Sequence, residues 1–241
     1  MKLISVNVGP PRDIIWRGKA VKSSIWKNPV EGRVHVSTLN LDGDQQSDLS
    51  VHGGVDKAIY VYPCEHYSYW HSQLPEVDLL WGAFGENFTT EGLFEDQAHI
   101  GDRLRAGSAE FIVTQPRMPC FKLGIRFDRP DMVKRFLYSK RTGFYLAVLR
   151  EGEVAGGDPI EFTDRQENGV TIADIVNLYT LDSENQELLR RATELPAFRM
   201  AGKSTSANAF GMPTPDHWPM SGLKTALPAT AGRDRLGPLA L

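Results

Sequence analysis

The chain has 241 residues, of which 41% are hydrophobic and 24% charged, and its formal net charge is −3. This composition is typical of a soluble globular protein, and the charge gives no reason to expect binding to nucleic acid or to a membrane. No apolar run approaches the ~20 residues of a membrane span. Residues 1–14 resemble a first strand and show no signal-peptide cleavage site, which predicts a cytoplasmic protein.

The chain contains two cysteines, Cys64 and Cys120, and neither belongs to a CxxC pair. A four-cysteine zinc site or an iron–sulfur cluster held by this chain alone is therefore excluded. Without a secretory signal, a structural disulfide is not expected.

Residues 1–165 are predicted to be mainly β. Short β-rich segments separated by Gly and Asp turn residues are typical of a barrel or a sandwich. The predicted strands lie within residues 3–9, 32–39, 58–63, 88–93, 102–107, 109–115, 143–152 and 158–163.

One helix is predicted over residues 63–74, because Pro63 suits the first helical position. Its Tyr67, Trp70, His71 and Leu74 recur at helical spacing, which predicts a single packed face. A second short helix is predicted over residues 128–139, with Asp131 near its start.

From residue 169 the pattern becomes helical, and residues 169–203 are predicted to form a three-helix appendage. Thr171 is the expected cap of the first helix, and Ser183 begins a capping box for the second. Pro196 is the expected start of the third helix. Residues 204–241 are rich in Pro and Ala and are predicted to be extended or disordered.

Residues 48–70 gather His52, Lys57 and His66 around the Gly53-Gly54 pair. Glycine permits a positive φ and a close approach of the backbone to a ligand. The same pattern also fits an ordinary hairpin turn with exposed polar ends, so both interpretations stay open.

Residues 81–93 form a glycine-rich segment whose backbone amides could hold an anion. The segment lacks both GxxxxGK and GxGxxG, so it is not a nucleotide-binding motif. A calcium loop over residues 42–53 is rejected, because Ser47 and Gly53 occupy the positions that require glycine and glutamate.

The segment TQPRMPCFKLGIRF begins and ends like a β-strand, yet two prolines interrupt it. Arg117 and Lys122 flank Cys120, and neighbouring cations favour a thiolate, which is a nucleophile or a soft metal ligand. A buried cysteine that acts as a small hydrophobe is the alternative.

Two further readings use the histidines. A Cys–His hydrolase could combine Cys120 with His52, His66 and Asn87, but no local nucleophile signature supports it. A zinc site formed by His52, His66 and Cys120 is disfavoured, because the neighbouring cations would repel Zn²⁺ and would instead hold an anionic ligand.

Four segments occur in order: GDQQSDLSVHGGVDKAIYVYPCEHYSYW, GAFGENFTTEGL, IGDRLRAGSAEF and QPRMPCFKL. Together they closely resemble the MOSC domain, the molybdenum cofactor sulfurase C-terminal domain. Within this family the chain is similar to the YiiM-type branch, which is associated with resistance to the N-hydroxylated base 6-hydroxylaminopurine. The resemblance covers residues 1–203, and the tail has no clear counterpart.

The resemblance implies a closed β-barrel that binds molybdenum cofactor, with Cys120 ligating the metal. It also implies reduction of N–OH groups to N–H, with electrons supplied by a separate reductase protein. Pyridoxal phosphate is not expected. The implied partners are a small N-hydroxylated molecule and the electron donor, without nucleic acid or membrane, and both a monomer and a homodimer stay open.

Because the implied cofactor is anionic, cations are expected around it. The predicted cofactor contacts are Lys27, Lys57, Asn87, Arg117 and Lys122. His52 and His66 are the expected proton donors, since histidine titrates near neutral pH. Cys64 is interpreted as a minor free thiol.

Two other functions stay open at this stage. Cys120 could carry sulfur as a persulfide, or the domain could store and deliver the cofactor without turnover. The two histidines favour an enzyme, because catalysis needs proton donors and carriage does not.

Overall fold

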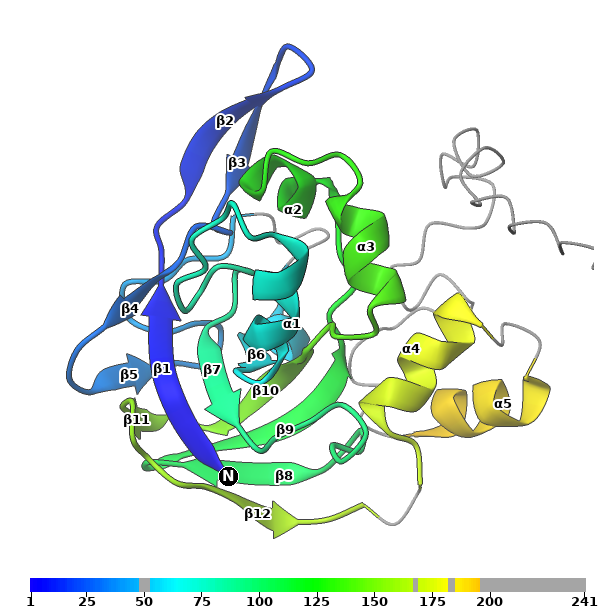
Figure 1. Ribbon diagram of the computed structural model, residues 1–241. Helices are drawn as coiled ribbons and strands as arrows, with labels where there is room; N and C mark the ends of the chain where they lie inside the picture. The colour runs from blue at the N-terminus through cyan, green and yellow to red at the C-terminus, as the bar shows by residue number, and fades with distance from the viewer. Residues whose placement is uncertain (48–52, 167–168, 182–184, 196–241) are drawn as a thin grey trace, which may run out of the picture. The chain divides into compact units, whose positions relative to one another are not determined.

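The computed structural model describes residues 1–47, 53–166, 169–181 and 185–195. The predicted β character is confirmed, since the main feature is an eight-stranded sheet (Figure 1). All described residues belong to one compact unit. The predicted division into a domain of residues 1–165, an appendage and a tail stays a prediction.

The eight strands pair in an order that differs from their order in the chain. Neighbours are antiparallel, except that β6 and β7 run parallel. From one edge to the other the strands are β12 (Ile160–Asp164), β8 (Arg103–Ala106), β9 (Ala109–Pro116), β10 (Phe144–Arg150), β6 (Ile59–Pro63), β7 (Phe88–Glu91), β1 (Lys2–Val8) and β4 (Asn28–Val30).

A closed barrel is not found, because the ladder of described strands ends at β12 on one side and at β4 on the other. The sheet nevertheless curls. An isolated bridge joins Lys2 to Pro159, and the backbone N–H of Leu3 donates to the carbonyl oxygen of Asp158 at 2.9 Å. The start of β1 therefore lies beside the chain that enters β12.

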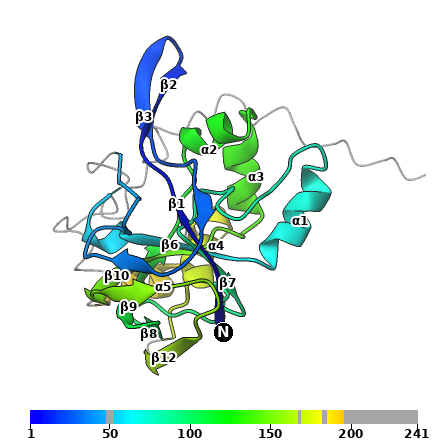
Figure 2. The same ribbon diagram turned by 90° about the vertical axis from the view of Figure 1, so that its left-hand side faces the viewer.

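Two small two-stranded sheets complete the β structure. They are formed by β2 (Arg12–Trp16) with β3 (Lys19–Ser23) and by β5 (Val34–Val36) with β11 (Gly152–Val154). The β2–β3 hairpin extends away from the main sheet beside α2 (Figures 1 and 2). Its turn residues Arg17 and Gly18 both have positive φ, as a type I′ turn requires.

Short helices follow the strands. They are η1 (Val55–Lys57), α1 (His66–Gln73), α2 (Phe121–Arg126), α3 (Met132–Tyr138), α4 (Ile172–Thr180) and α5 (Gln186–Glu194). The helix predicted from Pro63 starts three residues later, because Pro63 ends β6. Tyr67, Trp70 and Leu74 are buried as predicted, whereas His71 is exposed.

Helix α4 is embedded in the fold. Thr171 caps it as predicted, since its hydroxyl oxygen accepts from the backbone N–H of Asp174 at 3.0 Å. Ile172, Ile175 and Val176 are fully buried, and the helix contacts β9 and α3.

The cap of α5 differs from the prediction. The side chain of Asn185 accepts from the backbone N–H of Leu188 at 3.0 Å, so Asn185 is the cap, while Ser183 lies outside the described residues. The third helix, expected from Pro196, also lies outside them. Within the described ranges, no helix is long and apolar enough to cross a lipid bilayer.

An aromatic cluster joins the helices to the main sheet. The rings of Trp70 on α1 and Phe136 on α3 stack at 5.6 Å, and Tyr62 on β6 stacks on Phe136 at 5.9 Å. All three residues are fully buried. This packing fixes β6, whose residues Tyr60 and Tyr62 point into the cluster.

Candidate functional site

A cavity of about 110 Å³ lies between the end of β3, the start of β6, and the segment that leads from β9 into α2. It brings together side chains that are far apart in the sequence. Six predicted site residues line it, namely Lys27, Lys57, Asn87, Arg117, Cys120 and Lys122.

Cys120 reaches the cavity because β9 stops at Pro116. One further backbone hydrogen bond follows the ladder, in which the N–H of Arg117 donates to the carbonyl oxygen of Gly143 at 3.1 Å. Cys120 is extended and directly precedes α2. The predicted break is thus confirmed, but the segment after it is helical, whereas the sequence looked like a strand.

Arg117 presents an unsatisfied donor. Its side chain is 6% exposed, and its guanidinium lies 5.3 Å from the ring centre of Tyr60 and 5.1 Å from that of Phe136. The Nη1 atom is buried without a hydrogen-bond partner in the described structure. A buried donor left unpaired is costly, and Arg117 lines the cavity, so this residue could donate to an acceptor there.

Two more groups on the wall point to the same conclusion. Lys122 is also 6% exposed, and no described residue forms a hydrogen bond or an ion pair with its ammonium. The hydroxyl of Ser24 is buried without a described partner. The cavity therefore offers unused donors to a ligand.

Lys27, in contrast, is already paired. Its ammonium lies 2.6 Å from Oδ2 of Asp44, and Asn87 Nδ2 donates to the same oxygen at 2.8 Å. The backbone N–H of Gly9 donates to Oδ1 at 3.1 Å. Burial lowers the pKa of Lys27, while Asp44 opposes that shift.

Asp44 was not predicted as a site residue. It lies in the GDQQSDL segment, which belongs to the MOSC resemblance and does not fit a calcium loop. Asp44 could have been found from the chemistry of Lys27, because a buried lysine needs a carboxylate partner. Asn87 has a structural role as well, because its Oδ1 accepts from the backbone N–H of Tyr60 at 3.1 Å.

The glycine-rich segment binds its own carboxylate. Glu86 is fully buried and accepts backbone N–H groups from Gly82 at 2.8 Å and Phe84 at 3.1 Å. Its other donors are the hydroxyls of Tyr67 and Thr89. Burial raises the pKa of Glu86. The backbone amides of Gly82 and Phe84 are therefore occupied by the protein's own carboxylate and are not available to an external anion.

Lys57 lies at the end of η1, next to the Gly-Gly pair. Burial lowers its pKa, and the charge of Asp56 opposes the shift. The backbone N–H of Gly54 donates to Oε1 of Gln46 at 2.8 Å, which joins this turn to another residue of the cavity lining. His52 lies outside the described residues.

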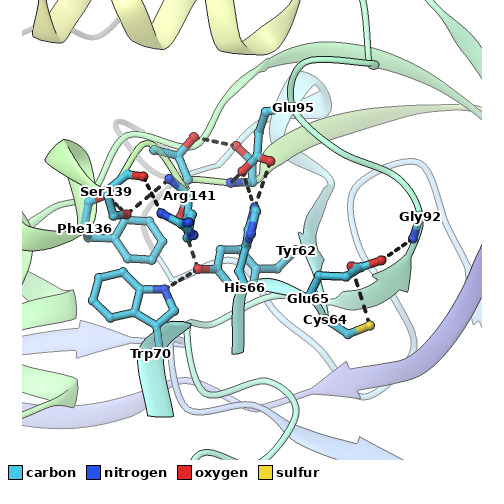
Figure 3. Close-up of polar contacts among 12 residues, drawn as sticks. Tyr62, Cys64, Glu65, His66, Trp70, Gly92, Glu95, Phe136, Ser139 and Arg141 are labelled. Carbon is cyan, nitrogen blue, oxygen red and sulfur yellow. Dashed lines mark hydrogen bonds and ion pairs between the residues drawn. The ribbon is translucent and has the colours of Figure 1, made fainter. Parts of the chain in front are cut away.

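His66 does not line the cavity. Its Nε2 atom lies 3.0 and 2.9 Å from the two carboxylate oxygens of Glu95, and the two side chains face each other in Figure 3. The ring of Tyr62 packs edge-on against it at 5.4 Å. The expected proton donation by His66 in the cavity is therefore not supported by its position.

The charge of the cavity suits an anionic ligand. Its described lining holds four basic side chains and one carboxylate, that of Asp44. No cluster of three His, Cys, Asp or Glu side chains in the described residues could hold a metal ion. In the part of the chain that the structure describes, Cys120 therefore has no set of neighbouring His, Cys, Asp or Glu side chains with which it could hold a metal ion.

Fold and site together define a mainly β protein with one cysteine on the wall of a cationic cavity. The MOSC domain matches residues 48–161. The solved structure of YiiM from Geobacillus stearothermophilus has a TM-score of 0.68 and 34% identity, covering 81% of this chain and 92% of that one. The chain belongs to the MOSC-domain family and is of the YiiM type, as predicted.

Two curated relatives add to this comparison. The uncharacterized protein YflK of Bacillus subtilis (strain 168) is 39% identical over 189 residues, which are 78% of this chain and 85% of YflK. A protein of Gibberella moniliformis (strain M3125 / FGSC 7600) named "Reductase" is 31% identical over 182 residues. That match covers 74% of this chain but 32% of the reductase.

Proposed function

We propose that this protein is a molybdenum-cofactor-dependent reductase that converts N–OH groups to N–H in N-hydroxylated compounds such as purine bases. The observation that carries the proposal is Cys120 on the wall of a cavity where Arg117 Nη1 is buried without a partner. Membership of the MOSC family and similarity to part of a reductase support it.

The cationic wall would hold the cofactor. Arg117 and Lys122 offer charged donors to its anionic groups, and charge-assisted hydrogen bonds are the strong kind. Ser24 adds a neutral donor. The cofactor, once bound, supplies the electron-transferring metal, and Cys120 supplies a thiolate ligand to it.

The reaction consumes two electrons and two protons and releases water. One proton must reach the hydroxyl oxygen, which leaves as water, and the other must reach the nitrogen. His66 faces Glu95 instead of the cavity. Lys27 and Lys57 line the cavity, and burial lowers the pKa of each, which makes their ammonium groups better proton donors than an exposed lysine. His52, which lies outside the described residues, stays a proposed donor.

The electrons would come from a separate donor protein. The match covers 32% of the Gibberella reductase, so most of that protein has no counterpart aligned with this chain. None of residues 169–181 or 185–195 lines the cavity. We propose that this helical segment supports the fold or the donor interface and supplies no metal ligand. A cytoplasmic monomer or homodimer is part of the same proposal.

The test is a reduction assay on protein made in two hosts, one competent and one deficient in cofactor synthesis. A small chemical reductant replaces the unknown donor, and 6-hydroxylaminopurine is the substrate. We expect molybdenum and turnover only in protein from the competent host. Molybdenum without turnover would favour a cofactor carrier, and a persulfide on Cys120 without molybdenum would favour a sulfur carrier.

A further inference from the structure

His66 and Glu95 form a buried pair outside the cavity, and the pair is connected to its wall. Glu95 is 5% exposed. The Nε2–H of His66 donates to the carboxylate, whose Oε1 also accepts the backbone N–H of Gly143 at 2.8 Å. One carboxylate thus joins α1 to the turn that precedes β10.

The turn at Gly143 packs closely against β6 and requires a glycine at this position. Its φ is +63°, a conformation that favours glycine. A Cβ atom there would lie 2.2 Å from the carbonyl oxygen of Val61 and 2.8 Å from the ring of Tyr60. The turn therefore sits directly on the strand, and Glu95 secures it from the other side.

The same turn holds two parts of the cavity wall. The carbonyl oxygen of Gly143 accepts the backbone N–H of Arg117 at 3.1 Å. The carbonyl oxygen of Thr142 accepts the hydroxyl of Tyr60 at 2.8 Å, and the ring of Tyr60 lies under the guanidinium of Arg117. Both the backbone of Arg117 and its aromatic support depend on residues 142 and 143.

The neighbouring residue strengthens this connection. The hydroxyl of Tyr62 donates to the carbonyl oxygen of Arg141 at 3.1 Å and accepts from Trp70 Nε1 at 2.6 Å (Figure 3). Residues 141, 142 and 143 are thus held by Tyr62, Tyr60 and Glu95, respectively. His66 and Trp70, which contact Glu95 and Tyr62, both lie on helix α1.

We infer that His66 and Glu95 are positioning residues for the cavity. By fixing the turn at Gly143, they hold the guanidinium of Arg117 over Tyr60 on the wall of the cavity. The inference rests on the proposed function only in treating the cavity as the functional site. Its test uses protein without cofactor, so its failure and the failure of the proposed function are separate outcomes.

The measurement is the Nε–H resonance of Arg117 in a nitrogen–proton correlation spectrum of the apo protein, assigned by its loss in Arg117→Lys. A guanidinium over the faces of Tyr60 and Phe136 is shifted upfield by ring currents. We expect His66→Ala and Glu95→Ala to move this resonance toward the ordinary arginine position. His71→Ala is the matched control, because His71 is an exposed histidine on the same helix.

If an alanine variant does not fold, conservative variants at the same positions still test the inference. His66→Gln retains a donor to Glu95 and should restore most of the wild-type shift, and Glu95→Gln retains an acceptor for Gly143. In loaded protein, His66→Ala should lower cofactor retention in the wild-type background but not further in Arg117→Ala. An unmoved Arg117 resonance in folded His66 and Glu95 variants would overturn the inference, as would an equal movement in His71→Ala.

Discussion

The ammonium of Lys27 and Oδ2 of Asp44 lie 2.6 Å apart inside a cavity whose other basic residues include Arg117 and Lys122. The Lys27 charge is therefore compensated by the protein itself. Arg117 Nη1, in contrast, has no described hydrogen-bond partner. The cationic wall thus combines an internal ion pair with donors that, in the described residues, have no acceptor.

Replacing one partner of the Lys27–Asp44 ion pair should lower the free energy of unfolding more than replacing both partners together. Lys27→Met or Asp44→Asn alone leaves a buried charge unpaired, and we expect each to lower the free energy of unfolding by roughly 3–5 kcal/mol. The double variant should lose clearly less than the sum of the two. Urea denaturation of all four proteins measures this, and additive losses would show that the two side chains do not form a unit.

Cofactor retention should depend most on the two cavity cations that no described carboxylate pairs, Arg117 and Lys122. Arg117→Ala and Lys122→Ala each remove a charged donor, a loss of roughly 1.5–3 kcal/mol or about ten- to a hundredfold in affinity. Lys27→Met should weaken retention less, because Asp44 already binds that ammonium. The measurement is molybdenum content after exhaustive dialysis, with the exposed Arg150→Ala as control. Equal retention in every variant would mean that the ligand lies elsewhere.

Much of the fold was predictable because its signals are local. Strand β9 buries alternate residues along most of its length, and Pro116 ends it, so the position of Cys120 beyond the break followed from the sequence. Thr171 and Asp174 form a capping box within four residues. Such patterns need no knowledge of distant partners.

The missed features depend on distant contacts. The β2–β3 hairpin carries charged residues on exposed positions, and its Trp16 finds a stacking partner only in Phe121, at 5.9 Å. Asp44 becomes a site residue only through Lys27. His66 is close in sequence to Lys57, but α1 starts late and directs its imidazole to Glu95.

Glu86 should be among the most important single residues for stability. It accepts hydrogen bonds from Tyr67, Gly82, Phe84 and Thr89, and Glu86→Ala would leave these buried donors without their acceptor. We expect a loss of roughly 3 kcal/mol or more in the free energy of unfolding.

The matched control is Glu76→Ala, which removes an exposed ion pair with Arg129 and should cost at most about 1 kcal/mol. Thermal or urea denaturation compares the two. Similar losses for both variants would contradict the role assigned to Glu86.

Cys64 should react slowly in the folded protein. Burial, followed by the charge of Glu65, raises the pKa of its thiol to about 11, so little thiolate exists at pH 8. In a Cys120→Ala background, iodoacetamide should alkylate Cys64 roughly tenfold or more slowly than in the same protein unfolded in urea. The rate should rise as the pH approaches 11. Equal rates in the folded and unfolded protein at pH 8 would contradict this prediction.

The most direct test of the proposed function is turnover of 6-hydroxylaminopurine per chain, driven by a chemical reductant, in wild-type protein, Cys120→Ala and Cys64→Ala, all made in a cofactor-competent host. Circular dichroism establishes that each variant is folded. The account predicts wild-type turnover in Cys64→Ala and loss to the background rate in Cys120→Ala. Full activity in a folded Cys120→Ala protein would show that this cysteine is not an essential ligand and would contradict the proposed function of the cavity.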